Sequence, residues 1–139
     1  MASSGVTKIL NFLNKCHGFE KVMHNVKIIS AGNGNCISEI KILPEQTNIF
    51  HGLHGGFATT LVDVLSSCAL LTHEKGECGH VSVNLSIDFL KGAKVGDTIL
   101  IDSKTLKVGK NLAFLSVEIK DKPSGTLLVK GSHTKYLLN

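Results

Sequence analysis

The 139-residue chain contains no arginine and no tryptophan, and it has only two prolines. Its formal charge of +4 therefore comes from lysines alone, and no two of these are adjacent. Proteins that bind nucleic acids usually rely on arginine for bidentate contacts with bases and phosphates, so the composition does not favour a nucleic-acid partner. A mild positive charge spread in this way suits a small anionic ligand better.

Long apolar runs and metal-binding motifs are also missing. No apolar run approaches the ~20 residues of a membrane span, so we expect no membrane-spanning segment. The pairs His51-x-x-His54 and Cys78-x-His80 belong to no zinc-like ligand set, so we expect no metal. Because no signal segment precedes the four cysteines, we expect reduced thiols and a cytoplasmic protein. The arginine-free start argues weakly against mitochondrial targeting, and that location stays open.

Hydrophobic residues make up 42% of the chain and charged residues 19%, which is typical of a folded domain and not of a disordered one. The length suits one domain of ordinary size, and no Pro/Ser-rich linker divides it. We therefore expect residues 1–139 to form a single domain.

The hydrophobic periodicity predicts both helices and strands. A first helix covers residues 6–13, capped by Ser3 or Ser4, and a short helical turn follows up to His24. The second helix, residues 57–71, is apolar nearly all round and should be buried, with Gly76 as its cap. Two strands joined by Gly32-Asn33-Gly34-Asn35 precede it and four follow it, at residues 26–31, 36–43, 80–89, 98–106, 112–121 and 126–138.

This order of elements predicts an α+β fold. One antiparallel sheet of about five or six strands would wrap around a single long helix, with an N-terminal helix added. One helix covers only one face of such a sheet. The sheet edges and the remaining apolar surface then need a partner, so we expect the chain to form oligomers.

Asp63 is an anomaly within the apolar helix, because a carboxylate is costly to bury unless it is paired. It is either a functional group, or a residue on the one wettable stripe of the helix with a structural hydrogen bond. His54-Gly55-Gly56 stands where the helix starts, and the free N–H groups there could polarise a carbonyl oxygen. A plain glycine-rich turn would explain the same residues.

Distance favours a site shared between two chains. Asp63 follows Gly55 by eight residues, which separates them by about 12 Å along a helix. One helix cannot place its own N-terminus and its own Asp63 around one carbonyl group. Two antiparallel copies of that helix in a dimer could do so.

Ser82 and Asn84 are polar positions of an otherwise alternating strand, so we expect them on one face that looks into a pocket. A solvated sheet face is the alternative, and it is the stronger one for Asn84. No Gly-x-Ser-x-Gly motif makes Ser82 a nucleophile. Four lysines around two turns could meet the phosphates of a nucleotide-like ligand or could simply be solvated, namely Lys91, Lys94, Lys107 and Lys110.

Taken together, these segments resemble the hotdog-fold thioesterases of the PaaI-like group. The likeness covers nearly the whole chain and is carried by residues 48–63 (NIFHGLHGGFATTLVD), 81–84 (VSVN), 89–97 (FLKGAKVGD) and 131–135 (GSHTK). It implies a hotdog fold, an antiparallel sheet wrapped around a long helix, paired into homodimers or homotetramers. It also implies hydrolysis of acyl-coenzyme A, with medium- to long-chain fatty acyl groups expected, and no cofactor, since coenzyme A is part of the substrate.

The resemblance also implies roles for particular residues. Asp63 and Ser82 would orient and activate water, and Gly55 of the other subunit, helped by Asn48, would polarise the thioester carbonyl. His54 would lie near the departing thiolate. Coenzyme A contacts would fall on Asn84, Phe89, Leu90, Lys91, Gly92, Ala93, Lys94, Lys107, Val108, Gly109, Lys110, Asn111, Leu112 and Tyr136.

This chain departs from the family pattern at two of these contacts. Relatives often carry proline at the position of Gly92 and aspartate at that of Asn84, and the departures could loosen the turn or change the nucleotide contacts. A hotdog hydratase would need a different Asp/His arrangement. A non-catalytic acyl-CoA-binding, lipid-binding or scaffold protein on the same fold is the alternative from another functional class.

Overall fold

The structure, a computed structural model, describes residues 3–139. Two α-helices are present, α1 (Ser4–Asn14) and α2 (Gly55–Leu71), together with two short 3-10 helices, η1 (Phe19–Met23) and η2 (Pro44–Gln46). The six strands are β1 (Lys27–Gly32), β2 (Asn35–Lys41), β3 (Gly79–Phe89), β4 (Thr98–Val108), β5 (Leu112–Asp121) and β6 (Leu127–Leu138). They form one antiparallel sheet in the order β1-β2-β4-β5-β6-β3.

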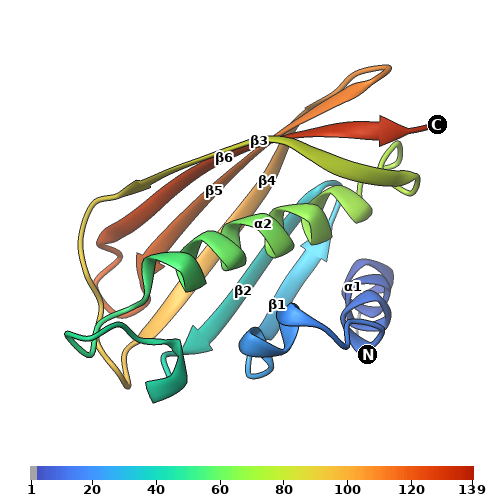
Figure 1. The fold of residues 1–139 in the computed structure, drawn as a ribbon. Coiled ribbons are helices and arrows are strands. Elements are labelled where there is room, and N and C mark those ends of the chain that lie inside the picture. Colours follow the sequence, from blue (N-terminus) through green and yellow to red (C-terminus); the bar gives the residue numbers. More distant parts are fainter. Residues whose placement is uncertain (1–2) are drawn as a thin grey trace.

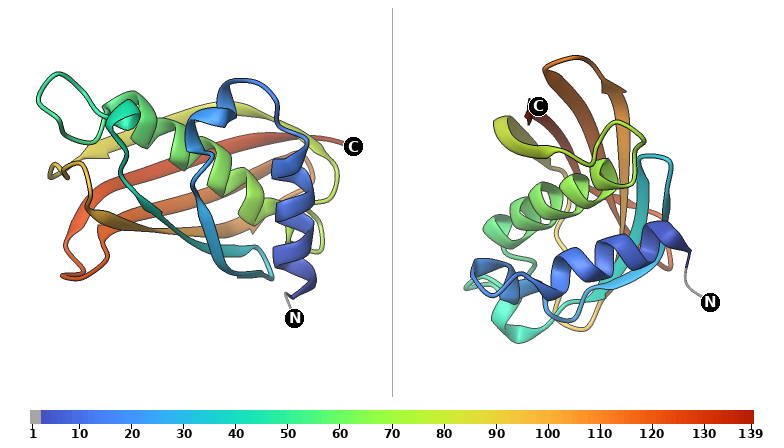
Figure 2. Two further views of the ribbon diagram at one scale, coloured as in Figure 1. Left: turned by 90° about the horizontal axis from the view of Figure 1, so that it is seen from below. Right: turned by 90° about the vertical axis from the view of Figure 1, so that its right-hand side faces the viewer.

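The sheet curves around α2, which crosses its concave face (Figure 1). The main core lies between them and joins one side of α2 to β2, β4, β5 and β6, with Leu61, Val62 and Leu65 completely buried. The N-terminal helix α1 packs beside β1, below α2 (Figure 2). The structure thus confirms the predicted α+β hotdog architecture.

Local signals explain the beginning of the chain. The Ser3 side chain caps α1 by accepting a hydrogen bond from the Val6 N–H, as predicted. The β1–β2 turn has φ values of 53° at Asn33 and 82° at Gly34, the left-handed pair that a tight two-residue hairpin requires. The predicted hairpin is therefore confirmed.

The predicted C-cap of α2 is wrong. The helix ends at Leu71 and is capped by Thr72, whose N–H donates to the Ala69 carbonyl, while the next N–H, that of His73, donates to the Leu70 carbonyl. Gly76 lies beyond the helix, in a turn that folds back so closely that a Cβ there would collide with the Leu70 carbonyl oxygen. Gly76 is thus required because the backbone comes so close to Leu70, and it does not cap the helix.

α2 is buried along most of its length, as its composition predicted, but one stripe is open. The Asp63 side chain is 47% exposed, and its neighbour Val64 is only partly buried. Within one chain, Asp63 therefore occupies the wettable stripe of the helix. Among residues 3–139, no helix is long and apolar enough to cross a membrane.

Candidate active site

The open stripe of α2 lies against a small hydrogen-bonded cluster. His133, on the inner face of β6, is 1% exposed and is bonded at both ring nitrogens. Its Nδ1 lies 2.8 Å from Ser66 Oγ on α2, and its Nε2 lies 2.7 Å from Ser82 Oγ on β3. The same Nε2 lies 3.8 Å from Asp63 Oδ1. The cluster thus brings together Asp63 and Ser82, the two residues predicted to handle water.

His133 is neutral at physiological pH. Burial, followed by the positive charge of Lys135, lowers its pKa to about 4, although Asp63 acts in the opposite direction. The contact with Asp63 is therefore not an ion pair near neutrality. A neutral imidazole donates from one nitrogen and accepts at the other, so either tautomer bonds both serines. The ring is thereby fixed, and it holds the Ser82 hydroxyl beside the Asp63 carboxylate.

A β-bulge explains why Ser82 points inward. Ser82 pairs with Lys135, while Asn84 pairs with Thr134, so the register shifts by one residue between them. Ser82 therefore shares the inner face with the buried side chains of β6, whereas Asn84 is exposed opposite the outward Thr134. The expectation that Ser82 and Asn84 share one strand face is wrong, because simple alternation takes no account of a bulge.

The second predicted group lies at the start of α2. His54 caps the helix, and its Nδ1 accepts a hydrogen bond of 2.8 Å from the Gly56 N–H. The Gly55 N–H has no hydrogen-bond partner among residues 3–139. Asn48 Oδ1 accepts from the N–H groups of Phe50 and Gly52, which leaves its amide nitrogen to donate. A free N–H at a helix N-terminus suits a developing oxyanion.

One chain does not bring the two groups together. Gly55 opens α2 and Asp63 lies eight residues further along the same helix, about 12 Å away along its axis. The structure therefore contains two halves of a site. The free N–H lies at one end of the helix, and the Asp63 carboxylate lies near its middle.

Asp63 also borders a cavity of about 440 Å³ between α1, α2 and the start of β3. Its apolar walls include Phe12 of α1, together with Val64 and Leu71 of α2. This volume falls within the range of pockets that hold small molecules. The cavity connects the candidate carboxylate with space for an apolar group.

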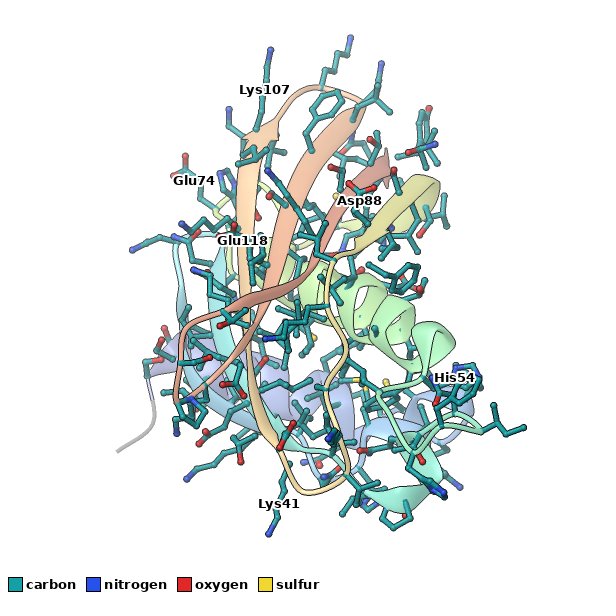
Figure 3. All side chains as sticks on the ribbon, turned by 90° about the vertical axis from the view of Figure 1, so that its left-hand side faces the viewer. Lys41, His54, Glu74, Asp88, Lys107 and Glu118 are labelled. Carbon is teal, nitrogen blue, oxygen red and sulfur yellow. The ribbon has the colours of Figure 1, made fainter. Side chains whose placement is uncertain are left out.

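The predicted coenzyme A contacts fall into separate groups. Phe89 ends β3 near the start of α2, residues 90–94 follow it, and part of this stretch lines two neighbouring cavities. Lys107 to Leu112 cover the end of β4, the turn and the first residue of β5, where Leu112 pairs with Tyr136. Figure 3 labels Lys107 at one end of the molecule and His54 toward the other. Because Phe89 pairs with Val129, the two groups are about 24 Å apart along β6 in one chain.

The sequence-based interpretation gave no role to Ser66, Ser67, His133 or Lys135. Lys135 is 6% exposed, and its ammonium group donates to Ser67 Oγ at 2.8 Å. Its burial lowers its pKa, while Asp63 and Cys68 act in the opposite direction. A histidine and a lysine at alternate positions, in register with apolar Val129 and Leu137, were the available signal. Among residues 3–139, no three or more potential metal ligands gather in one place.

The buried histidine predicts a pH-dependent stability. The folded-state pKa of His133 is about 4, below its ordinary 6.5, so the buried neutral ring costs no stability above pH 6.5. As the pH falls from 6.5 towards 4, the free energy of unfolding decreases, because the histidine binds a proton in the unfolded state first. We expect His133 to lower the free energy of unfolding by about 3 kcal/mol over this window.

Urea denaturation at a series of pH values measures this effect. Burial and the charge of Lys135 lower the pKa of His80 to about 4 as well, so His80 adds to the slope. The variant His133→Gln, whose amide does not titrate, should lose only the part of the pH dependence that comes from His133. An unchanged slope in His133→Gln would contradict the prediction.

The thioesterase superfamily profile matches residues 50–128 of the chain. The chain is 40% identical to human acyl-coenzyme A thioesterase 13 over 137 residues, which cover 99% of this chain and 97% of the relative. The crystal structure of zebrafish thioesterase superfamily member 2 superposes with a TM-score of 0.91 at 36% identity, covering 99% of both chains. The mouse protein of that name gives a TM-score of 0.90 at 37% identity, covering 99% of this chain and all of the other.

Proposed function

Because this chain belongs to the thioesterase superfamily, we propose that it is an acyl-coenzyme A thioesterase whose active site forms between two subunits. The chain is a thioester hydrolase, and the human relative is named for acyl-coenzyme A. The observation that carries the proposal is the Asp63, Ser82 and His133 cluster, which sits beside a cavity and lies away from the free N–H of Gly55.

The proposed reaction is one hydrolytic step. Asp63 and Ser82 hold a water molecule, whose oxygen attacks the thioester carbonyl while Asp63 accepts its proton. The Gly55 N–H of the neighbouring subunit, assisted by Asn48, stabilises the negative charge that develops on the carbonyl oxygen. The carbon–sulfur bond then breaks, and coenzyme A leaves as a thiolate near His54. The proton held by Asp63 passes to the thiolate or to solvent.

Apolar side chains along the edge strand β3 support the need for a second subunit. Val81, Val83 and Phe89 of this strand are all more than half exposed in the single chain. Unpaired edge strands that carry apolar side chains tend to recruit another strand. A two-fold pair would place the α2 helices antiparallel, so that the helix start of one chain approaches Asp63 of the other.

The cavity beside Asp63 is the proposed acyl site, and we expect it to favour medium- to long-chain fatty acyl groups. Phe12, Val64 and Leu71 would contact the chain. Each methylene buried there contributes about 0.8 kcal/mol, or roughly fourfold in kcat/KM, until the cavity is full. The lysines near the two turns, Lys91, Lys94, Lys107 and Lys110, would contact the coenzyme A phosphates, contributed by different subunits.

A hydrolysis assay over straight-chain acyl-CoA substrates from acetyl to palmitoyl tests this function, with released thiol as the readout. We expect kcat/KM to rise with chain length and then level off. Phe12→Ala, which enlarges the cavity, should move the plateau to longer chains, whereas the exposed Phe19→Ala should leave it in place. Tight binding of acyl-CoA without thiol release would contradict the proposal and favour a binding or scaffold protein.

A further inference from the structure

Lys135 is a buried cation to which the proposed reaction gives no role. It lies on the inner face of β6, two residues after His133, with 6% of its surface exposed. A lysine is rarely buried this deeply unless its charge is paired. Within residues 3–139, its ammonium group makes one hydrogen bond, to Ser67 Oγ on α2 at 2.8 Å. It also lines the same cavity as Asp63.

Ser67 connects this ammonium group to the turn of α2 that carries Asp63. The Ser67 hydroxyl donates to the Asp63 backbone carbonyl at 2.9 Å, so the chain of bonds runs from Lys135 through Ser67 to Asp63. A parallel connection runs through Ser66, whose Oγ lies 3.2 Å from the same carbonyl oxygen and 2.8 Å from His133 Nδ1. Two adjacent serines thus tie one peptide group of α2 to two inward side chains of β6.

The groups around Lys135 leave one carboxylate as its main electrostatic partner. His133 on β6 and His80 on β3 both have their pKa lowered to about 4, so both rings are neutral near pH 7. The Cys68 thiol on α2 has its pKa raised by burial and is also neutral. Glu77 is paired with Lys8, which leaves Glu20 of η1 and Asp63 among the acids of this cavity. Of these two, Asp63 acts on Lys135.

We propose that Lys135 is a positioning residue for thioester hydrolysis. Its ammonium group holds the Asp63 turn in place through Ser67. This inference rests on the proposed function, because it assigns Lys135 to the base of that reaction. The Asp63 side chain is half exposed in the chain, so its own burial does not fix its position. The connection through Ser67 supplies that constraint from the backbone side.

The test is the pH–rate profile of acyl-CoA hydrolysis, measured between pH 4.5 and 9 for matched variants. Lys135→Met keeps most of the side-chain volume and removes the charge. We expect its kcat to fall about tenfold across the profile at nearly unchanged KM, because the turn that carries Asp63 loses the hydrogen bond that positions it. Lys130→Met, which removes an exposed lysine from the outer face of the same strand, should leave the profile unchanged.

Two further variants separate position from charge. Ser67→Ala cuts the hydrogen-bonded connection but keeps the ammonium group, so kcat should fall about tenfold, as in Lys135→Met. Lys135→Arg keeps a charged N–H donor for Ser67, so it should recover part of the kcat that Lys135→Met loses. These two variants test the proposal even if Lys135→Met does not fold.

The outcomes distinguish this inference from the function on which it depends. Wild-type protein that releases no thiol from any acyl-CoA overturns the proposed function. An active wild type, together with a Lys135→Met profile that follows Lys130→Met, or with wild-type kcat in Ser67→Ala, overturns the role of Lys135 alone. Lower thermal stability in Lys135→Met with an unchanged kcat assigns Lys135 to folding and also overturns the proposal.

Discussion

Replacing Asp63 by asparagine is expected to lower kcat for acyl-CoA hydrolysis by about 10²–10⁴-fold. The amide has nearly the shape of the carboxylate but cannot accept the proton of the attacking water. The Asp63 side chain is half exposed, so the substitution leaves no cavity in the core. Thiol release under substrate saturation measures kcat, and thermal denaturation checks the fold.

Asp88→Asn is the matched control for this substitution. Asp88 lies on β3, is exposed and pairs opposite Lys130, so the variant removes the same charge from a neighbouring strand outside the cavity. We expect near wild-type kcat in Asp88→Asn. If Asp63→Asn also turned over at the wild-type rate, Asp63 would not be the base, and Ser82 with His133 would have to activate water alone.

The elements with long and regular patterns were predicted closely. The alternation at residues 80–89 and the apolar stretch at 57–71 correspond to β3 (Gly79–Phe89) and α2 (Gly55–Leu71). These patterns follow from which side of an element is buried, and the sequence records that directly. The end of α2 was missed because Thr72 caps it, whereas Gly76, the more conspicuous signal, serves a close backbone approach.

Half of the candidate site could be read from the sequence and half could not. Asp63 was found because it contrasts with its neighbours on one helix. His133 and Lys135 act only through partners more than fifty positions away in the chain, Ser66, Ser67 and Ser82. Sheet register brings these residues together, and the bulge after Ser82 changes that register by one residue. Local periodicity contains no information on the register of the sheet or on the position of the bulge.

The exposure of Asp63 shows where a single chain stops being sufficient. Its helix is apolar nearly all round, and the sequence left open whether the carboxylate is a functional group or lies on the one wettable stripe. In one chain the side chain is 47% exposed, on the only open stripe of α2 among the described residues. An apolar helix with such a stripe lies next to an edge strand with exposed apolar side chains. This is the composition expected of a surface that a second subunit covers.

Gly55→Pro is expected to lower kcat by about 10²–10³-fold, because it removes the one N–H that the proposed reaction directs at the oxyanion. Proline is well tolerated at the first position of a helix, and the extended backbone of His54 (φ −67°, ψ 130°) suits a residue before proline. Gly55→Ala keeps the N–H, and its Cβ would lie 3.4 Å from the Phe89 ring, an ordinary contact. Kinetics of the two variants, with circular dichroism to check the helix, separate loss of the donor from loss of shape.

Mixing Gly55→Pro with Asp63→Asn tests whether the two halves come from different chains. Each variant alone is nearly inactive, but a mixed dimer contains one site with an intact Asp63 from the first chain and an intact Gly55 from the second. After joint refolding at equal amounts, about half of the dimers are mixed and each has one working site, so activity should recover to about a quarter of wild type. If both groups served a carbonyl within one chain, every site would lack one of them and no activity would return. Recovery therefore requires that the helix start of one subunit reaches the carboxylate of its neighbour.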